Sequence, residues 1–220
     1  MFARFEFWKD KGLHPHVIYD VGAHMGNWTR QMKQLFPEAQ YILFEANTEH
    51  TEILKDLSAN LVLLGSQSKP NTPYFKNTAG CTTGNSIYCE KTIYFTPQMA
   101  MVELLPMMRL DEFISQHHLP PPDFIKLDVQ GAELDILVGA GEFLSNVRYC
   151  VLETSLHEYN HGAPLIEDVI IFMKERGFCL IDIVELHKIN GYLAQADLFF
   201  AHSSTGLRKP HFYDGFLKFE

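Results

Sequence analysis

The sequence predicts an α/β fold with a doubly wound, mostly parallel sheet of seven strands. A buried strand is expected at 17–21, and it runs through a glycine loop into a helix that ends near residue 36. Short apolar strands and amphipathic helices then alternate, which is typical of parallel strands joined by right-handed crossovers. Asn190-Gly191 signals a tight hairpin, so the last strand should run antiparallel to the sheet.

The remaining strands are short apolar runs, several of which end in an acidic residue. They are expected at 40–45, 61–64, 124–128, 147–153, 179–184 and 197–201. Asn27 should cap the first helix of the sheet and Thr48 the next, in which Ile53, Leu54 and Leu57 share one face. Later helices are expected at 111–117, with Asp111 as its cap, at 132–138 and at 165–176.

One domain of 1–220 accounts for the length of the chain. Residues 1–16 form an aromatic, partly helical lead-in, and the tail at 202–220 carries aromatic residues that suggest docking. Turn residues dominate an insertion at 65–106, where short antiparallel strands are expected at 88–95 and 101–105. A connection of this length is more often functional than idle, and a decorative β-insertion is the alternative.

Composition restricts the class of protein. Hydrophobic residues make up 46% and charged residues 20%, which is ordinary for a globular domain. The net charge of −9 argues against a general nucleic-acid-binding surface. The chain shows no apolar segment of about 18 residues and no signal peptide, so we expect no membrane span and a cytoplasmic location.

The loop after the first strand favours a cationic ligand. A dinucleotide-binding loop reads G-x-G-x-x-G, but here the glycines are Gly22 and Gly26, and Asp20 precedes them. A carboxylate at the strand end repels a pyrophosphate, whereas it suits S-adenosyl-L-methionine, which carries an ammonium and a sulfonium. His24 stands where such loops commonly have glycine, and histidine is among the residues that tolerate a positive φ. An ordinary strand-to-helix turn is the alternative.

Four carboxylates should lie at one edge of the sheet, because the strands that carry them end there. They are Asp20, Glu45, Asp128 and Glu153. Ligands of open α/β sheets bind outside the carboxyl ends of the strands. Glu45 follows Gly26 by 19 positions, the spacing at which an acid takes ribose hydroxyls in nucleotide-binding folds. Each acid alone would also be explained as a helix N-cap.

Together these motifs resemble the FkbM-type methyltransferases over 17–201. The motifs are DVGAHMG at 20–26, FEAN at 44–47, RLDEF at 109–113, and DFIKLDVQGAE at 123–133. The K-x-D-x-x-G-x-E pattern at 126–133 is the specific part, and Asn85-Ser86 resembles a further short element of the family. The sequence departs from the family at His24, where Asn is usual, and at Ala46, where Pro is usual. The resemblance implies a seven-stranded, Rossmann-like class I fold and S-adenosylmethionine-dependent methylation of hydroxyls on sugars and natural products.

The sequence therefore predicts an O-methyltransferase with a small-molecule or carbohydrate acceptor and no nucleic-acid partner; it leaves the oligomeric state open. The residues expected to bind the cofactor are Asp20, Gly22, Ala23, His24, Gly26, Glu45, Ala46, Ser66 and Asp128. Within this set, Glu45 should take the ribose and Ser66 should lie near the adenine.

Lys126 is an anomaly in the predicted fourth strand, where it shares a face with Asp128. An unpaired ammonium is expensive to bury. Lys126 either pairs with Asp128 or Glu153 to hold the sheet edge, or it tunes Asp128 as the base that takes the acceptor proton, with Glu153 opposite. His157 is the next candidate base.

Two other functions remain open at this point: a nicotinamide-dependent oxidoreductase and a non-catalytic cofactor-binding protein. Asp20 and the missing middle glycine count against the first. We expect no metal at the histidine pairs of the chain, although Asp128 with Glu153 is the alternative site for a divalent cation.

Overall fold

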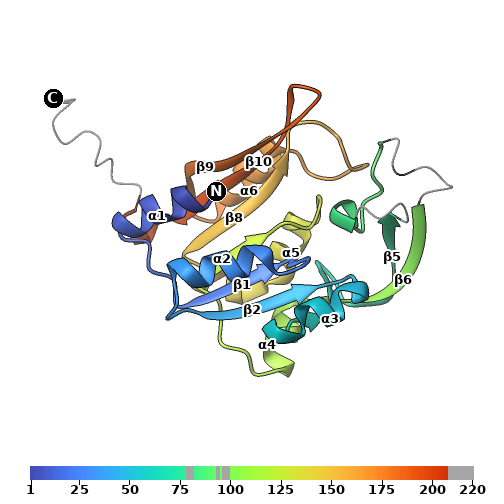
Figure 1. Cartoon of the computed structure of the whole chain (residues 1–220), viewed down its shortest axis with the longest axis horizontal. Helices are drawn as coiled ribbons and strands as arrows, with labels where there is room; N and C mark the ends of the chain where they lie inside the picture. Colours follow the sequence, from blue (N-terminus) through green and yellow to red (C-terminus); the bar gives the residue numbers. More distant parts are fainter. Residues whose placement is uncertain (78–81, 93–94, 96–99, 208–220) are drawn as a thin grey trace.

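Seven strands form the central sheet in a computed structural model, which describes residues 1–77, 82–92, 95 and 100–207 (Figure 1). In chain order they are β1 (Val17–Val21), β2 (Gln40–Glu45), β3 (Asn60–Leu61), β7 (Phe124–Leu127), β8 (Tyr149–Ser155), β9 (Phe178–Ile189) and β10 (Tyr192–His202). Their order across the sheet is β3-β2-β1-β7-β8-β10-β9. β10 runs antiparallel to both β8 and β9, whereas the other pairs are parallel. The predicted fold class is confirmed, and Asn190 and Gly191 form the hairpin turn with φ of 51° and 83°.

The strand order changes direction between β1 and β7. The chain leaves β1 toward β2 on one side, and it returns to pair β7 on the other side. Such a switch point opens a crevice at the carboxyl ends of the strands, where α/β proteins bind their ligands. Asp20 and Lys126 face each other in register just before this edge.

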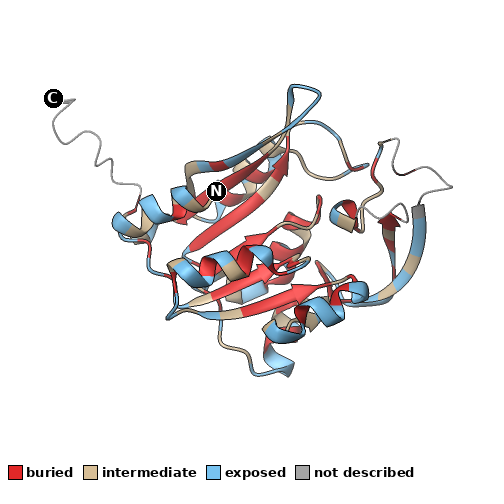
Figure 2. Ribbon diagram, in the orientation of Figure 1, coloured by how far each residue is buried: buried red, intermediate tan, exposed pale blue. Residues whose placement is uncertain are grey.

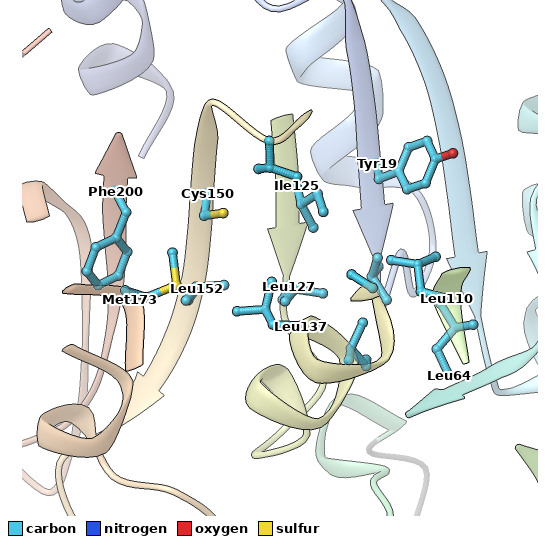
Figure 3. Packing of buried hydrophobic residues seen from close by; sticks show 14 of the residues in the cluster. Tyr19, Leu64, Leu110, Ile125, Leu127, Leu137, Cys150, Leu152, Met173 and Phe200 are labelled. Carbon is cyan, nitrogen blue, oxygen red and sulfur yellow. The ribbon is translucent and has the colours of Figure 1, made fainter. Parts of the chain in front are cut away.

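Helices cover both faces of the sheet. On one face α1 (Phe2–Asp10) and α2 (Asn27–Leu35) pack Phe5 and Trp28 against Phe124 and Phe199. On the other face lie α4 (Leu110–Gln116), α5 (Glu133–Gly139) and α6 (Ile166–Glu175). Figure 2 shows the buried strands between these layers, and Figure 3 shows Leu137 and Met173 among the apolar side chains of the second core.

The insertion builds a second sheet of three strands, β4 (Leu63–Gly65), β5 (Lys69–Asn77) and β6 (Ala100–Arg109), in the order β4-β6-β5. The strand predicted at 61–64 was therefore wrong in part, because it is divided between β3 and β4. The strand predicted at 88–95 was also wrong: β5 pairs with β6 instead, and residues 93–94 lie outside the described part. β5 contains Pro70 and Pro73, which a strand tolerates at the edge of a sheet.

Three helix starts differ from the predicted ones. Gly26, with φ 76°, is the N-cap of α2, and Asn27 is its first residue. After β2, the side chain of Asn47 caps a 3-10 turn that begins at Thr48, and this turn leads into the short α3 (Thr51–Leu54). Ile53 is exposed there, while Leu54 is buried. Asp111 lies inside the first turn of α4, because its carboxylate pairs with Arg109 instead of capping the helix.

Among the described residues, no helix is both long enough and apolar enough to cross a membrane. Most of the predicted tail, residues 208–220, falls outside the described part. The boundaries predicted for the domain and for its insertion remain predictions.

Candidate functional site

A cavity of about 240 Å³ opens at the carboxyl edge of β1, β2 and β7. Its lining comes from the loops after these strands, from β8 and α5, and from the insertion. The predicted site residues that line it are Gly22, His24, Glu45, Ala46, Asp128 and Glu153. Residues more than 100 positions apart in the sequence thus meet at this cavity, as expected if the carboxyl ends of their strands lie at one edge of the sheet.

The β1 loop packs tightly against the end of β7. Gly22 has φ +75°, and a Cβ added there would lie 2.0 Å from the backbone oxygen of Asp128. Only glycine fits this approach without a shift of the backbone. His24 has φ 50°, in agreement with its expected tolerance of a positive φ.

The N–H groups of this loop are used inside the protein. Those of Gly22 and Ala23 both donate to the carbonyl of Phe44, at 3.0 Å each. The N–H of His24 donates to Glu45, and that of Gly26 donates to the carbonyl of Ala23. These four groups cannot serve a phosphate, so the loop is not the anion cradle that a pyrophosphate needs.

Glu45 is a buried carboxylate held by two backbone donors. Its Oε2 accepts from the N–H of His24 and its Oε1 from that of Asn47, each at 2.7 Å. These bonds fix the carboxylate at the cavity, and each oxygen keeps further capacity to accept a hydrogen bond. A carboxylate so oriented suits a diol.

The insertion reaches the β1 loop through Thr82. Its Oγ1 lies 2.8 Å from Nε2 of His24 and 3.3 Å from Nε2 of His50. The two imidazoles meet edge to face, with centroids 4.5 Å apart. Burial and the neighbouring His50 lower the pKa of His24. Thr82 and Thr83 line the cavity, so the insertion forms part of the site.

Lys126 lies beneath the cavity. Its Nζ is 3.2 Å from Asp20 Oδ1 and 3.3 Å from Asp128 Oδ2, and it donates to the carbonyl of Gly22. Burial alone would lower the pKa of Lys126, but the carboxylates of Asp128 and Asp20 outweigh it and raise that pKa. The predicted pairing with Asp128 is present, and the second partner is Asp20 instead of Glu153.

Asp20 is a positioning residue in this arrangement. It is fully buried, and its Oδ2 accepts from the hydroxyl of Thr29 at 2.7 Å. It is not among the residues that line the cavity, it contacts Lys126, and its predicted contact with the cofactor stays a prediction. Ser66 is also away from the cavity, because its hydroxyl donates to Asp135.

Several other predicted residues lie near the cavity without lining it. They are Ala23, Gly26 and Lys126. His157 is exposed and lines no part of the cavity. No group of three or more metal-ligating side chains within the described ranges has the geometry of a metal site.

Gln130 joins the two remaining carboxylates. Its Nε2 donates to Glu153 Oε2 and, at 3.4 Å, to Asp128 Oδ1. Gln130 has φ 57°, which is unusual outside glycine. Its carbonyl accepts from Ser86 at 2.9 Å and from Asn160 at 2.6 Å, so the insertion and the segment after β8 hold this residue in place.

The two carboxylates titrate differently. Burial works to raise the pKa of Asp128, but the ammonium of Lys126 and the amide of Gln130 bring it below its ordinary value. Burial raises the pKa of Glu153 well above its ordinary value, and the nearby charges of Asp128 and Asp197 add to this effect. One carboxylate therefore stays ionised, and the other holds a proton more readily.

The antiparallel strands supply functional residues that sequence reasoning missed. Asp197 lies opposite Glu153 in the pairing of β10 with β8. Gln195 donates to Glu153 Oε2 at 3.1 Å, and His187 on β9 lies 2.7 Å from Asp197. No local motif marks these residues, because the register of the last hairpin brings them to the site.

The cavity fits the cationic cofactor that the sequence predicts. Gly22 lines the cavity beside Asp128, which supplies a negative charge compensated by Lys126. Asn85 lines the cavity with its Nδ2 buried and without a hydrogen-bond partner. Such an orphaned donor is costly unless a ligand accepts from it.

Comparison with known structures shows the same fold. The plantazolicin methyltransferase BamL, solved with a triazolic desmethylPZN analog and SAH, is 9% identical, with a TM-score of 0.51, over 91% of this chain and 82% of that one. Methyltransferase FkbM from Methylobacillus flagellatus KT is 13% identical, with a TM-score of 0.50, over 84% of this chain. This match spans 43% of that longer chain. No curated protein matches the sequence.

The family is shown by the sequence. The pattern of the methyltransferase FkbM domain matches residues 20–180, which is most of the chain and includes the loops that build the cavity. This match confirms the predicted family, the enzyme class and the cofactor, S-adenosyl-L-methionine, and it excludes the nicotinamide-dependent oxidoreductase. The chain belongs to the FkbM family of S-adenosylmethionine-dependent methyltransferases.

Proposed function

We propose that this methyltransferase transfers the methyl group to a hydroxyl of a sugar or natural-product-like small molecule. The observation that carries the proposal is a single cavity that holds the oriented carboxylate of Glu45 together with the bridged pair Asp128 and Glu153. The carboxylate of Glu45 suits a ribose. The pair Asp128 and Glu153 offers a fixed negative charge and a proton acceptor.

The cofactor is assigned to residues by the chemistry of its parts. Glu45 accepts hydrogen bonds from the ribose hydroxyls, beside Ala46. The apolar side chains at the same cavity, among them Leu64 and Ile136, suit the adenine ring. Asp128 and the loop of Gly22, Ala23, His24 and Gly26 take the cationic methionine end, with Asp20 and Lys126 supporting them from below.

The cofactor supplies an activated methyl group on a positively charged sulfur. What the chain contributes is orientation, because an in-line displacement depends on holding the acceptor oxygen and the methyl carbon in line. Lys126 fixes Asp128, and Gln130 fixes Asp128 relative to Glu153. Ser86 and Asn160 in turn hold the backbone carbonyl of Gln130.

A neutral acceptor agrees with the charge around the cavity. The charge of Asp128 raises the proton affinities of Glu133, Glu153 and Asp197, so negative charge is already concentrated here. A carboxylate or phosphate on the acceptor would add to this repulsion, whereas the hydroxyls of a polyol form hydrogen bonds with carboxylates. This reasoning favours hydroxylated small molecules over nucleic acid.

The test is transfer of a labelled methyl group. Purified protein is incubated with S-adenosylmethionine labelled in the methyl group and with pooled neutral polyols, methyl glycosides and hydroxylated macrolides. We expect label in a methyl ether and an equal amount of S-adenosylhomocysteine, with less of both products from Glu45→Ala when the cofactor is not saturating. Transfer to a parallel pool of amines and carboxylates, with none to the hydroxyl compounds, would contradict the proposed acceptor.

A further inference from the structure

Glu153 and Asp197 lie side by side on antiparallel strands. They are register partners between β8 and β10, a position that brings the Cβ atoms of two residues to about 5 Å. Both side chains are buried, with 10% of Glu153 and 5% of Asp197 exposed. Two carboxylates at this spacing resist simultaneous ionisation, so one of them holds a proton more firmly than an isolated acid.

One imidazole connects the pair to the surface. Nε2 of His187 lies 2.7 Å from Asp197 Oδ2 and 3.9 Å from Glu153 Oε1. His187 is 37% exposed, and its hydrogen bond to Asp197 raises the pKa of the imidazole. A protonated His187 keeps Asp197 ionised, although burial raises the pKa of that carboxyl.

The two oxygens of Glu153 have different surroundings. Oε2 accepts from the amides of both Gln130 and Gln195, which fixes the plane of the carboxylate. Oε1 accepts no hydrogen bond from either amide, Nε2 of His187 lies 3.9 Å from it, and Glu153 lines the cavity. Asp128 differs, because each of its oxygens faces a donor: Lys126 on one side and Gln130 on the other.

We propose that Glu153 is the general base of the reaction, with Oε1 as the accepting oxygen, and that Asp197, its register partner on β10, is a positioning residue. The inference rests on the proposed hydroxyl acceptor. It changes the sequence-based assignment of the base from Asp128 to Glu153. Asp128 keeps a different role, that of a fixed charge beside the cationic end of the cofactor. Enzymes often assign the roles of base and fixed charge to two acids whose surroundings give them different proton affinities.

Protons and charges balance in the proposed methyl transfer. As the acceptor oxygen bonds to the methyl carbon, the carbon–sulfur bond breaks and its electron pair stays on sulfur as a neutral thioether. Oε1 of Glu153 takes the hydroxyl proton. The positive charge on sulfur and the negative charge on Glu153 therefore disappear together, which a buried site favours. The proton later passes to solvent, toward which His187 is exposed.

The charged groups around Glu153 determine whether a substitution raises or lowers its proton affinity. Asp128 and Lys126 face it from the end of β7, Glu133 from α5, Asp197 from β10 and His187 from β9. Removal of the negative charge at Asp197 lowers the proton affinity of Glu153. Asparagine at 197 preserves the shape of the side chain and can still accept from His187.

The experiment compares two ligands of opposite charge over pH. Affinities of S-adenosylmethionine, with its sulfonium, and of S-adenosylhomocysteine, with a neutral sulfur, are measured by calorimetry from pH 5 to 9. Ionised Glu153 favours the first ligand, so the ratio of the two affinities rises with pH through the midpoint of Glu153. The ammonium and carboxylate shared by both ligands cancel in this ratio.

Asp197→Asn should move this midpoint down by about one pH unit. Glu153→Gln should remove it, and any pH dependence left in that variant belongs to His187 or His24. Asp182→Asn is the matched control, because Asp182 is a partly buried carboxylate on the neighbouring strand β9 that bonds to Arg4 and Trp8 instead. The control should keep the wild-type midpoint. Asp197→Thr serves as a second variant if Asp197→Asn does not fold.

The outcomes separate the two proposals. An unchanged midpoint in Asp197→Asn, or a wild-type profile in Glu153→Gln, would overturn the role of this pair while leaving the cofactor site intact. Failure of both ligands to bind the wild-type protein would overturn the proposed function and this inference with it. A carbon-13 titration of the Glu153 carboxyl, assigned with Glu153→Gln, gives the same midpoint without either ligand.

Discussion

The ammonium of Lys126 lies 3.2 Å from the carboxylate of Asp20, and both side chains are shielded from solvent, at 5% and 0% exposure. The two residues are register partners on β7 and β1, so the ion pair joins neighbouring strands at the switch point of the sheet. Lys126 also donates to the carbonyl of Gly22 in the loop above. The pair therefore couples the core of the sheet to the floor of the cavity.

Lys126→Met should strongly destabilise the protein. It leaves Asp20 as a fully buried charge with only the hydroxyl of Thr29 to bond, and loss of one partner of a buried pair costs about 3–5 kcal/mol. Urea unfolding measures the loss. In the double variant Asp20→Asn with Lys126→Met, part of the stability should return, because the uncompensated charge is gone. If Lys126→Met and the double variant are equally stable, the uncompensated charge of Asp20 is not the cause of the loss.

A comparison of two glycines with the same φ distinguishes backbone strain from steric contact at Gly22. Gly22 and Gly162 both have φ +75°, but a Cβ at Gly162 would meet nothing within 4 Å. Gly162→Ala should therefore cost only the strain of a left-handed residue, about 1–2 kcal/mol, and keep cofactor affinity. Gly22→Ala adds a collision with the backbone oxygen of Asp128, so it should lose more stability and bind S-adenosylhomocysteine at least about tenfold more weakly. Similar behaviour of the two variants in melting and calorimetry would contradict the proposed fit.

The sequence was sufficient for the parts of the site that are local. The strand, loop and helix around Gly22, the position of Glu45 at the cavity and the positive φ of His24 could each be predicted from short stretches. Asp128 and Lys126 followed from a period of two along one strand.

The parts that depend on long-range register could not be predicted. Asp197 reaches Glu153 only because β10 inserts between β8 and β9, and residue types alone do not encode that order. β5 was missed because its prolines suggest a turn, although an edge strand accepts them. Ser66 follows β4, which turns away from the central sheet into the smaller one, so its place beside the adenine stays a prediction.

Glu133 should make stability depend on pH. It is buried, and burial raises its pKa to about 7 although the N–H groups of Val129 and Gly131 bond to it. The unfolded chain releases this proton near its ordinary, lower pKa. Stability from Glu133 is therefore complete below about pH 4.5 and is lost as pH rises through 7, a loss of about 3 kcal/mol.

Glu133→Gln should remove that loss. The variant keeps an oxygen that accepts from the same N–H groups but carries no charge, so it should match the wild type near pH 5 and exceed its stability near pH 8 by about 2–3 kcal/mol. Glu38→Gln, at an exposed position, is the control and should show no such difference. The quantity to compare is the difference in stability between Glu133→Gln and the wild type. If this difference is no larger at pH 8 than at pH 5, the raised pKa of Glu133 is contradicted.

Cofactor product should raise the melting temperature, whereas NAD and NADP should not. At a ligand concentration about 100-fold above Kd, binding stabilises the folded state by ~2.7 kcal/mol, or roughly 5–11 °C for a domain of this size. The β1 loop supports this selectivity, because its N–H groups bond within the protein instead of waiting for a pyrophosphate. A shift with NAD and none with S-adenosylhomocysteine, measured by scanning fluorimetry, would be incompatible with the proposed site.

The assignment of Glu45 to the ribose is the most direct point at which to test the account. Calorimetry compares S-adenosylhomocysteine with its 2′-deoxy analogue on the wild type and on Glu45→Ala. A carboxylate that accepts from ribose hydroxyls contributes about 1.5–3 kcal/mol per bond, so the wild type should prefer the ribose form by about tenfold or more. Glu45→Ala should bind both ligands with equal, weaker affinity. If the variant keeps the wild-type preference for the ribose form, the ribose lies elsewhere, and the proposed placement of the cofactor in this cavity is wrong.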